Sequence, residues 1–165
     1  IVYGLSAFGL SRQLKIYPRE AKKFIDQYFA LYKKVKVYME ETVAEAKEVG
    51  FTQTLMNRKR YMPDLESQNR QLREAAGRVA INSPVQGSAA DLIKLAMIRL
   101  AQKIREKKLK SRMILQVHDE LVFECPEEEE QEMRALVKKE MEGVVPLKVP
   151  LVVDMGWGKN WNTAH

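Results

Sequence analysis

The chain has 165 residues, and 45% of them are hydrophobic, which is enough to bury a core and excludes a chain that is disordered throughout. Its 28 Lys and Arg residues against 22 Asp and Glu residues give a net charge of +6, which favours a polyanionic partner. The single cysteine, Cys125, excludes an internal disulfide, and no apolar run approaches the roughly 20 residues of a membrane span. We therefore expect a soluble, cytoplasmic protein without a membrane partner.

The start of the sequence predicts a piece of a longer chain, because Ile1–Gly4 has no initiator methionine and no capping residue ahead of its apolar start. Two helices are predicted next. The first opens at Tyr17–Glu20, with a proline near its first turn. The second runs from about Val35 to Val49 and ends at Gly50, where a left-handed cap is favoured.

Two short extended stretches, Phe51–Leu55 and Tyr61–Leu65, are predicted to flank a basic turn in which Asn57 is a suitable turn residue. The turn contains Arg58-Lys59-Arg60, the densest basic cluster of the sequence and a candidate for contact with phosphate groups. Basic turns are also common on surfaces that bind nothing, so the cluster alone does not identify a ligand.

The longest predicted helix runs from about Gln71 to Lys107. Pro84 lies inside it, where it removes one backbone hydrogen bond and clashes with the Ala80 carbonyl, so a kink is expected. The predicted apolar stripe of this helix consists of Val85, Ala89, Leu92, Ala96 and Leu100.

Another face of the same helix carries three hydrogen-bond donors at spacings of four residues, Arg78, Asn82 and Gln86. Purine N3 and pyrimidine O2 acceptors occupy similar places in correctly paired bases, so a row of donors in the minor groove can read pairing geometry without reading sequence. A solvated helix face is the alternative. Tyr3, expected at the end of a truncated helix, can stack on a base, which is worth about 1–3 kcal/mol, or pack in a core.

A β-hairpin is predicted for Arg112–Cys125, with a polar tip in which Asp119 and Glu120 place adjacent carboxylates beside His118. Mg²⁺ binds one or two carboxylates and completes its octahedron with substrate phosphates, so a rigidly held tip suits a metal site. An ordinary solvated turn is the alternative, because Asp and Glu are common in such turns.

A further helix is predicted to begin after Pro126, with Glu127–Glu130 at its positive end. Alternating apolar residues predict a final strand at Leu147–Met155. This order of elements predicts an α+β fold with an antiparallel sheet and long packed helices. We expect two portions, residues 1–67 and 68–165.

Five segments resemble motifs of one known family, in the order in which that family carries them. Gln116–Glu124 is similar to its palm motif C, and Asn82–Asp91 to its long palm helix. Tyr3-Gly4 resembles the end of its fingers helix, and Thr54–Leu65 and the closing Val149-Pro150-Leu151 with Gly156-Trp157-Gly158 also match. The family is family A of the DNA polymerases, of the bacterial DNA polymerase I type, and the resemblance covers nearly the whole chain.

The resemblance implies part of a helical fingers subdomain in residues 1–67 and the C-terminal part of a palm, with its antiparallel sheet, in residues 68–165. It implies template-directed 5′ to 3′ DNA synthesis, in which a primer 3′-hydroxyl attacks the α-phosphate of a deoxynucleoside triphosphate with the help of two Mg²⁺ ions. Asp119 is then the metal ligand and Glu120 a supporting carboxylate. Primer-template DNA would be contacted by Tyr3, Arg58, Lys59, Arg60, Arg78, Asn82, Gln86 and His118.

The resemblance also implies what the sequence lacks. The family's second catalytic aspartate and the Arg and Lys that hold the triphosphate precede these motifs, and none of them is present. Asp119 by itself cannot organise a two-metal geometry, so we predict that the chain alone does not polymerise DNA. It would need an upstream polymerase portion, either from the same chain or as a separate subunit, and the sequence leaves both open.

Two other functions compete with polymerisation: a non-catalytic DNA-binding module derived from a polymerase palm, and a basic structural domain. The acidic residues of the hairpin tip argue against the binding module, because carboxylates repel phosphate groups. The ordered set of motifs argues against the structural domain.

Overall fold

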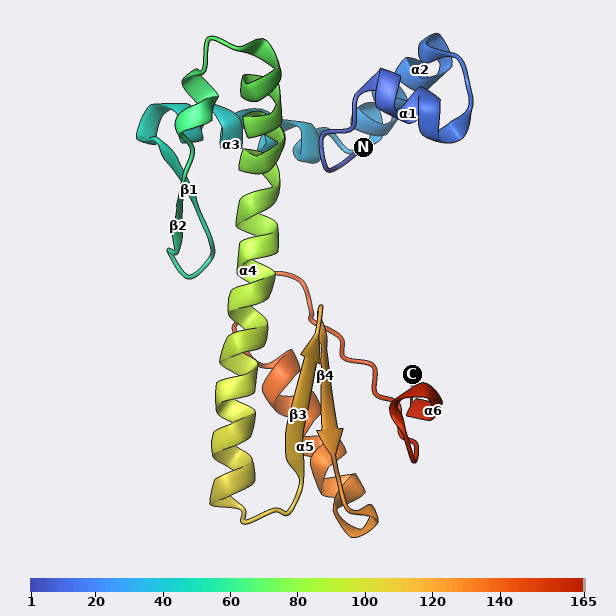
Figure 1. Ribbon diagram of the computed structural model, residues 1–165, viewed down its shortest axis with the longest axis vertical. Helices are drawn as coiled ribbons and strands as arrows, with labels where there is room; N and C mark the ends of the chain where they lie inside the picture. Colours follow the sequence, from blue (N-terminus) through green and yellow to red (C-terminus); the bar gives the residue numbers. More distant parts are fainter. Residues whose placement is uncertain (165) are drawn as a thin grey trace. The chain divides into compact units, whose positions relative to one another are not determined.

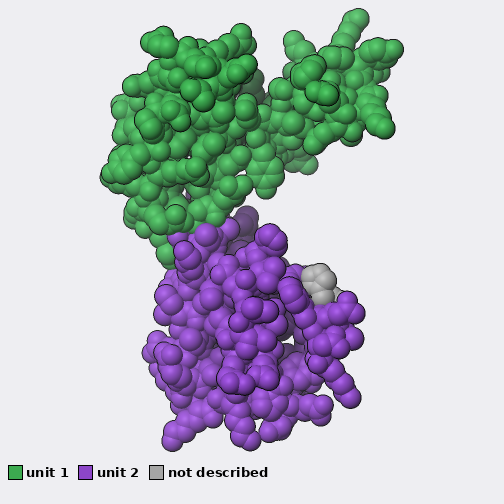
Figure 2. All heavy atoms as spheres, viewed as in Figure 1, with its two compact units in different colours: residues 1–88 green, residues 89–165 purple. Residues whose placement is uncertain are grey.

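The computed structural model describes residues 1–164. They form two compact units, residues 1–88 and 89–164 (Figure 2). The division falls inside the long helix α4 (Arg70–Glu106). The predicted division into residues 1–67 and 68–165 is one between polymerase subdomains. The compact units do not test it, and it stays a prediction.

Three helices begin the first unit: α1 (Ala7–Leu14), α2 (Pro18–Leu31) and α3 (Lys33–Val49) (Figure 1). The side chain of Ser6 caps α1 by accepting a hydrogen bond from the backbone N–H of Gly9, the third residue of the helix. Gly50 ends α3 with a φ of 80°, as the sequence predicted. The second and third helices thus confirm the predicted pair, with α3 starting two residues earlier than expected.

The first hairpin consists of the antiparallel strands β1 (Phe51–Gln53) and β2 (Lys59–Tyr61). The extended stretch predicted at Tyr61–Leu65 is wrong beyond its first residues. A 3₁₀ helix, η1 (Pro63–Glu66), replaces it, because proline fixes φ near a helical value and cannot donate to a strand ladder.

The core of the first unit packs α3, η1 and α4 together through Ala46, Met62, Leu65, Ala76 and Ala80. The predicted apolar stripe of α4 is therefore wrong in this unit, where Val85 is 56% exposed. The buried face of α4 is set by the elements that pack on it, and they cover the small residues of its first turns.

Helix α4 continues through Pro84 without a break, as Figure 1 shows. Neighbouring serine hydroxyls donate to carbonyl groups within the helix, Ser83 to Val79 and Ser88 to Pro84. The helix is thus as long as predicted, and a kink at the proline stays a prediction.

The second unit contains the antiparallel hairpin of β3 (Arg112–Val117) and β4 (Glu120–Glu124), as predicted. A 3₁₀ turn, η2 (Glu127–Glu129), leads into α5 (Glu130–Glu142). The core of this unit joins α4 and α5, and its buried residues are Leu100, Ile104, Met133, Leu136 and Val137.

The strand predicted at Leu147–Met155 is wrong: this segment has no regular structure, although the short helix α6 (Trp161–Ala164) follows it. Pro150 interrupts the segment, because proline cannot donate to a strand ladder. The backbone N–H of Val153 donates to the Glu142 carboxylate at 3.1 Å instead of to a neighbouring strand. In residues 1–164 the sheets are therefore two separate two-stranded hairpins, within the α+β class that the sequence predicted.

Candidate functional site

The β1–β2 hairpin carries the basic cluster. Thr52 pairs with Arg60 and Gln53 with Lys59, which extends strand β2 into the cluster. Asn57 closes the turn with a φ of 61°, in the left-handed region that asparagine adopts more readily than most residues. The sequence predicted the whole cluster in the turn, but only its first member lies there.

Two arginines of the cluster are bonded to α4. Arg58 Nη2 donates to the Gly87 carbonyl oxygen at 3.0 Å, and Arg60 Nη1 donates to Ser83 Oγ at 3.1 Å. Lys59 instead places its ammonium nitrogen 4.1 Å from the ring centre of the first residue of β1. All three side chains are exposed, but part of the hydrogen-bonding capacity of the arginines is used within the unit.

Arg78, the first residue of the donor row of α4, lies beside Gly4 near the start of the chain. Arg78 and Gln86 are exposed and Asn82 is half-buried. A Cβ atom on Gly4 would lie 2.8 Å from Arg78 Cγ, so only glycine permits this approach. Tyr3 is 63% exposed and lies in a turn, not at the end of a helix, because the positive φ of Gly4 closes that turn. Its ring is therefore not packed in the core of the described residues, and stacking on a base stays a prediction.

A polar hollow of about 80 Å³ separates the hairpin from α4. This volume is far below the roughly 300–1,000 Å³ of sites for small molecules, so the hollow is too small for a nucleotide. The polar side chains that line it include Thr52, Thr54, Arg58, Arg60, Ser83 and Gln86.

The acidic tip is a two-residue turn. Val117 pairs with Glu120, which leaves His118 and Asp119 at the tip. His118 has a φ of 54°, and its carbonyl oxygen accepts a hydrogen bond from Gln116 Nε2 at 3.0 Å. His118 and Asp119 are exposed and Glu120 is half-buried, so the hairpin presents the Asp119 carboxylate to solvent, at the tip predicted from the sequence.

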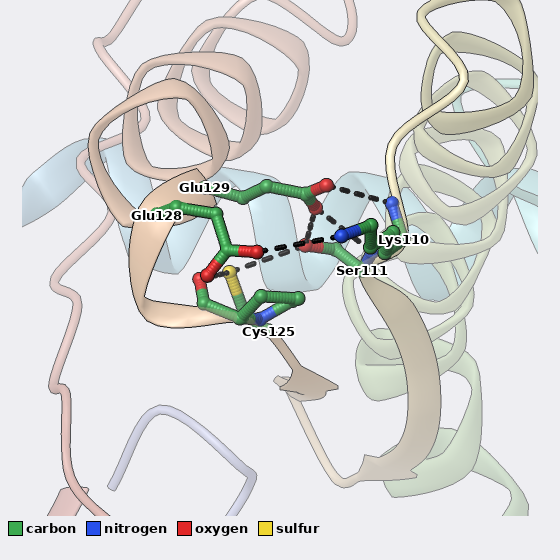
Figure 3. A network of polar contacts seen from close by, with 6 residues as sticks. Lys110, Ser111, Cys125, Glu128 and Glu129 are labelled. Carbon is green, nitrogen blue, oxygen red and sulfur yellow. Dashed lines mark hydrogen bonds and ion pairs between the residues drawn. The ribbon is translucent and has the colours of Figure 1, made fainter.

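The open end of this hairpin is held by an anchor that the sequence did not reveal (Figure 3). The Glu129 carboxylate accepts the backbone N–H of Lys110 at 2.8 Å, and the N–H and hydroxyl of Ser111 at 2.9 and 2.6 Å. Ser111 is 1% exposed, and its Oγ lies 3.1 Å from the sulfur of Cys125, directly after β4. The acidic run Glu127–Glu130 was interpreted only as helix polarity, because sequence spacing gives no sign of this long-range contact.

The hydrogen bond from the Ser111 hydroxyl, followed by the bond from the Lys110 backbone, lowers the pKa of Glu129 below the ordinary glutamate value. Glu129 therefore stays ionised at neutral pH and keeps its acceptor role.

Asp119 provides the type of ligand that Mg²⁺ prefers, a carboxylate oxygen. The described part of the chain, residues 1–164, contains no group of three or more His, Cys, Asp or Glu side chains that could hold a metal ion. The carboxylates at the tip thus fit Mg²⁺ in chemistry, and a complete site needs ligands from elsewhere.

The predicted site residues fall into two sets. The second unit holds His118, Asp119 and Glu120. The first unit holds Tyr3, Arg58, Lys59, Arg60, Arg78, Asn82 and Gln86. Each set lies on one compact unit, and their combination into one site stays a prediction. Among residues 1–164, no helix is both long enough and apolar enough to cross a bilayer.

Residues 1–163 match the family described as DNA polymerase family A. The chain is 56% identical over 161 residues to DNA polymerase I of Caldicellulosiruptor bescii, covering 98% of this chain and 19% of that protein. It is 52% identical over 164 residues to DNA polymerase I of Bacillus subtilis, covering 99% and 19%. The chain therefore spans about a fifth of the length of these relatives.

A solved structure is also similar: the POL domain of Pol1 from M. smegmatis in complex with DNA primer-template and dNTP. The TM-score is 0.97 and the sequence identity 50%, over 99% of this chain and 29% of the other.

Proposed function

Because the chain belongs to DNA polymerase family A, we propose that it takes part in template-directed DNA synthesis together with an upstream polymerase portion. In this reaction a primer 3′-hydroxyl attacks the α-phosphate of a deoxynucleoside triphosphate, a phosphodiester bond forms, and pyrophosphate leaves. The observation that carries the proposal is the exposed Asp119 at the tip of an anchored hairpin, inside a family match over residues 1–163.

Asp119 would hold Mg²⁺ through its carboxylate, and Glu120 would act beside it as a supporting carboxylate. When bound, two Mg²⁺ ions activate the 3′-hydroxyl and stabilise the leaving pyrophosphate. The chain contributes the fixed position of its carboxylate, which the two-residue turn and the Glu129 anchor support. The second aspartate would come from the upstream portion, so the chain alone would not polymerise DNA.

The first unit would bind the primer-template. The side chains that can donate to the minor-groove acceptors of the last base pairs are Arg78, Asn82 and Gln86. These hydrogen bonds favour binding of correctly paired primer ends at any sequence. The exposed ring of Tyr3 can stack on a template base, and His118 would contact the primer end. The similar M. smegmatis structure, which is described as a complex with primer-template DNA and dNTP, supports both partners. The reaction would serve DNA replication and repair in the cytoplasm.

Primer extension tests the proposal. The chain is assayed with Mg²⁺, a primer-template and all four deoxynucleoside triphosphates, first alone and then with the upstream portion restored. We expect extension only in the second case, because both metal-binding carboxylates are then present. Extension by the chain alone would contradict the missing second ligand.

Binding without extension in either case would favour the non-catalytic DNA-binding module. Gel-shift measurement of primer-template affinity in the same samples distinguishes this outcome from an unfolded or inert protein.

A further inference from the structure

The β1–β2 hairpin is bonded to one short stretch of α4, residues 83–88. Three hydrogen bonds join the two elements, and each reaches a residue next to Pro84 or within four positions of it. They run from Arg58 Nη2 to Gly87 O at 3.0 Å, from Arg60 Nη1 to Ser83 Oγ at 3.1 Å, and from the Leu55 backbone nitrogen to Ser88 Oγ at 2.9 Å.

This stretch of α4 is intrinsically weak. Pro84 has no N–H, so it cannot donate to the Ala80 carbonyl as a helical residue would. The hydroxyls of Ser83 and Ser88 bond the carbonyls four residues earlier, at 2.7 and 2.5 Å, a pattern that slightly destabilises and bends helices. Contacts from outside the helix therefore have a large share in fixing its backbone here.

The approach of hairpin and helix depends on Gly87. A Cβ atom at this position would lie 2.6 Å from Thr54 Cγ2 and 3.4 Å from Arg58 Nη2. Thr54 is 7% exposed, so it has little room to move away. The contact is thus close-packed as well as hydrogen-bonded.

We propose that Arg58 and Arg60 are positioning residues that hold the stretch of α4 bearing Asn82 and Gln86, rather than phosphate ligands. Asn82 directly precedes the serine that Arg60 bonds, and Gln86 directly precedes the glycine whose carbonyl Arg58 bonds. The inference rests on the proposed function, because it is there that Asn82 and Gln86 read the base pairs. It narrows the predicted basic cluster to one candidate phosphate contact, Lys59.

The test compares Arg58→Ala and Arg60→Ala with Lys59→Ala, the matched control in the same hairpin, in the polymerase with its upstream portion. A lost phosphate contact lowers the slope of log affinity against log salt by about 0.9. We expect this decrease for Lys59→Ala only. For the two arginine variants we expect an unchanged slope and about a tenfold loss of discrimination between matched and mismatched primer ends. A slope lowered by about 0.9 with unchanged discrimination would overturn the proposal.

Hydrogen exchange of the backbone amides of residues 82–88, measured without DNA, tests independently of activity whether Arg58 and Arg60 hold this part of α4. We expect exchange about tenfold faster in each arginine variant and unchanged in Lys59→Ala. Equal exchange in all three would overturn the proposal. If the unchanged polymerase neither bound nor extended a primer, the proposed function would fail. The exchange result would still decide whether the two arginines hold residues 82–88 of α4.

Discussion

The two hairpins of the molecule share a left-handed residue in the turn, but they are hydrogen-bonded to their surroundings at different ends. Asn57 and His118 both close their turns with left-handed backbone, at φ of 61° and 54°. The β1–β2 hairpin is bonded to α4 from its turn and its second strand. The β3–β4 hairpin is bonded at its open end, where Ser111 meets the Glu129 carboxylate.

The difference shows how placement of the anchor decides what a hairpin can present. A hairpin held along its length commits its polar groups to a neighbour and stabilises that neighbour. A hairpin held at its open end keeps its turn exposed, as His118 and Asp119 are here. The first arrangement suits support of a binding surface, and the second suits presentation of a carboxylate to substrate and metal.

The first prediction tests whether the β3–β4 hairpin presents a metal ligand, and it removes the carboxylate of Asp119. Asp119→Asn keeps the shape of the tip and removes its charge. In the polymerase with its upstream portion restored, we expect kcat to fall at least about 1,000-fold, because a metal ligand supplies several kcal/mol of transition-state stabilisation. Steady-state primer extension measures the loss.

Glu127→Gln is the matched control, since it removes an exposed carboxylate of the same unit away from the tip. Its kcat should equal that of the unchanged protein. Activity retained in Asp119→Asn would remove the metal assignment, whatever the control shows.

The second prediction concerns the core that supports the acidic hairpin. Leu100 is fully buried between α4 and α5, so Leu100→Ala should lower the free energy of unfolding by about 2–5 kcal/mol. Ile98, two positions away, is 65% exposed, and Ile98→Ala should change it by less than about 0.5 kcal/mol. Thermal unfolding of both variants measures the contrast, and equal losses would show that this core does not support the unit.

The β3–β4 hairpin and the left-handed turn residue Asn57 were predictable from sequence, because they depend on short-range chemistry, whereas strand β2 lies earlier than predicted. The tip at His118-Asp119 followed from two apolar strands around polar residues, and the ends of α2 and α3 followed from Pro18 and Gly50. The contacts that hold the hairpins were not predictable. Arg58 reaches Gly87, 29 residues away, and no periodicity encodes such a pair.

The errors have the same origin. Val85 fits an apolar stripe by spacing, but the elements that pack on α4 cover a different face, and Val85 is 56% exposed. The segment Leu147–Met155 alternates as a strand would, yet strand structure requires a neighbouring backbone to pair with. In the described residues, β3 and β4 pair only with each other.

The third prediction uses pH to release the anchor of the acidic hairpin. The pKa of Glu129 is lowered in the folded state, so its stabilising effect is complete above the ordinary glutamate pKa and is lost as pH falls through the lowered value. Glu129→Gln cannot titrate. Its Tm should therefore lie below that of the unchanged protein at neutral pH, and the gap should close in acid. A gap that is constant with pH would show that the charge of Glu129 has no part in the anchor.

The last prediction sharpens the feature that the two hairpins share. Alanine tolerates left-handed backbone less well than asparagine or histidine, so Asn57→Ala and His118→Ala should each lower the free energy of unfolding by about 1 kcal/mol. Asn57→Gly and His118→Gly should stay within about 0.5 kcal/mol of the natural residues, because glycine adopts positive φ freely. Denaturant unfolding measures all four variants. A loss at Asn57 without one at His118 would mean that the β1–β2 hairpin depends on its left-handed turn residue while the tip at His118 can relax, which would contradict the turn requirement that we assign to both hairpins.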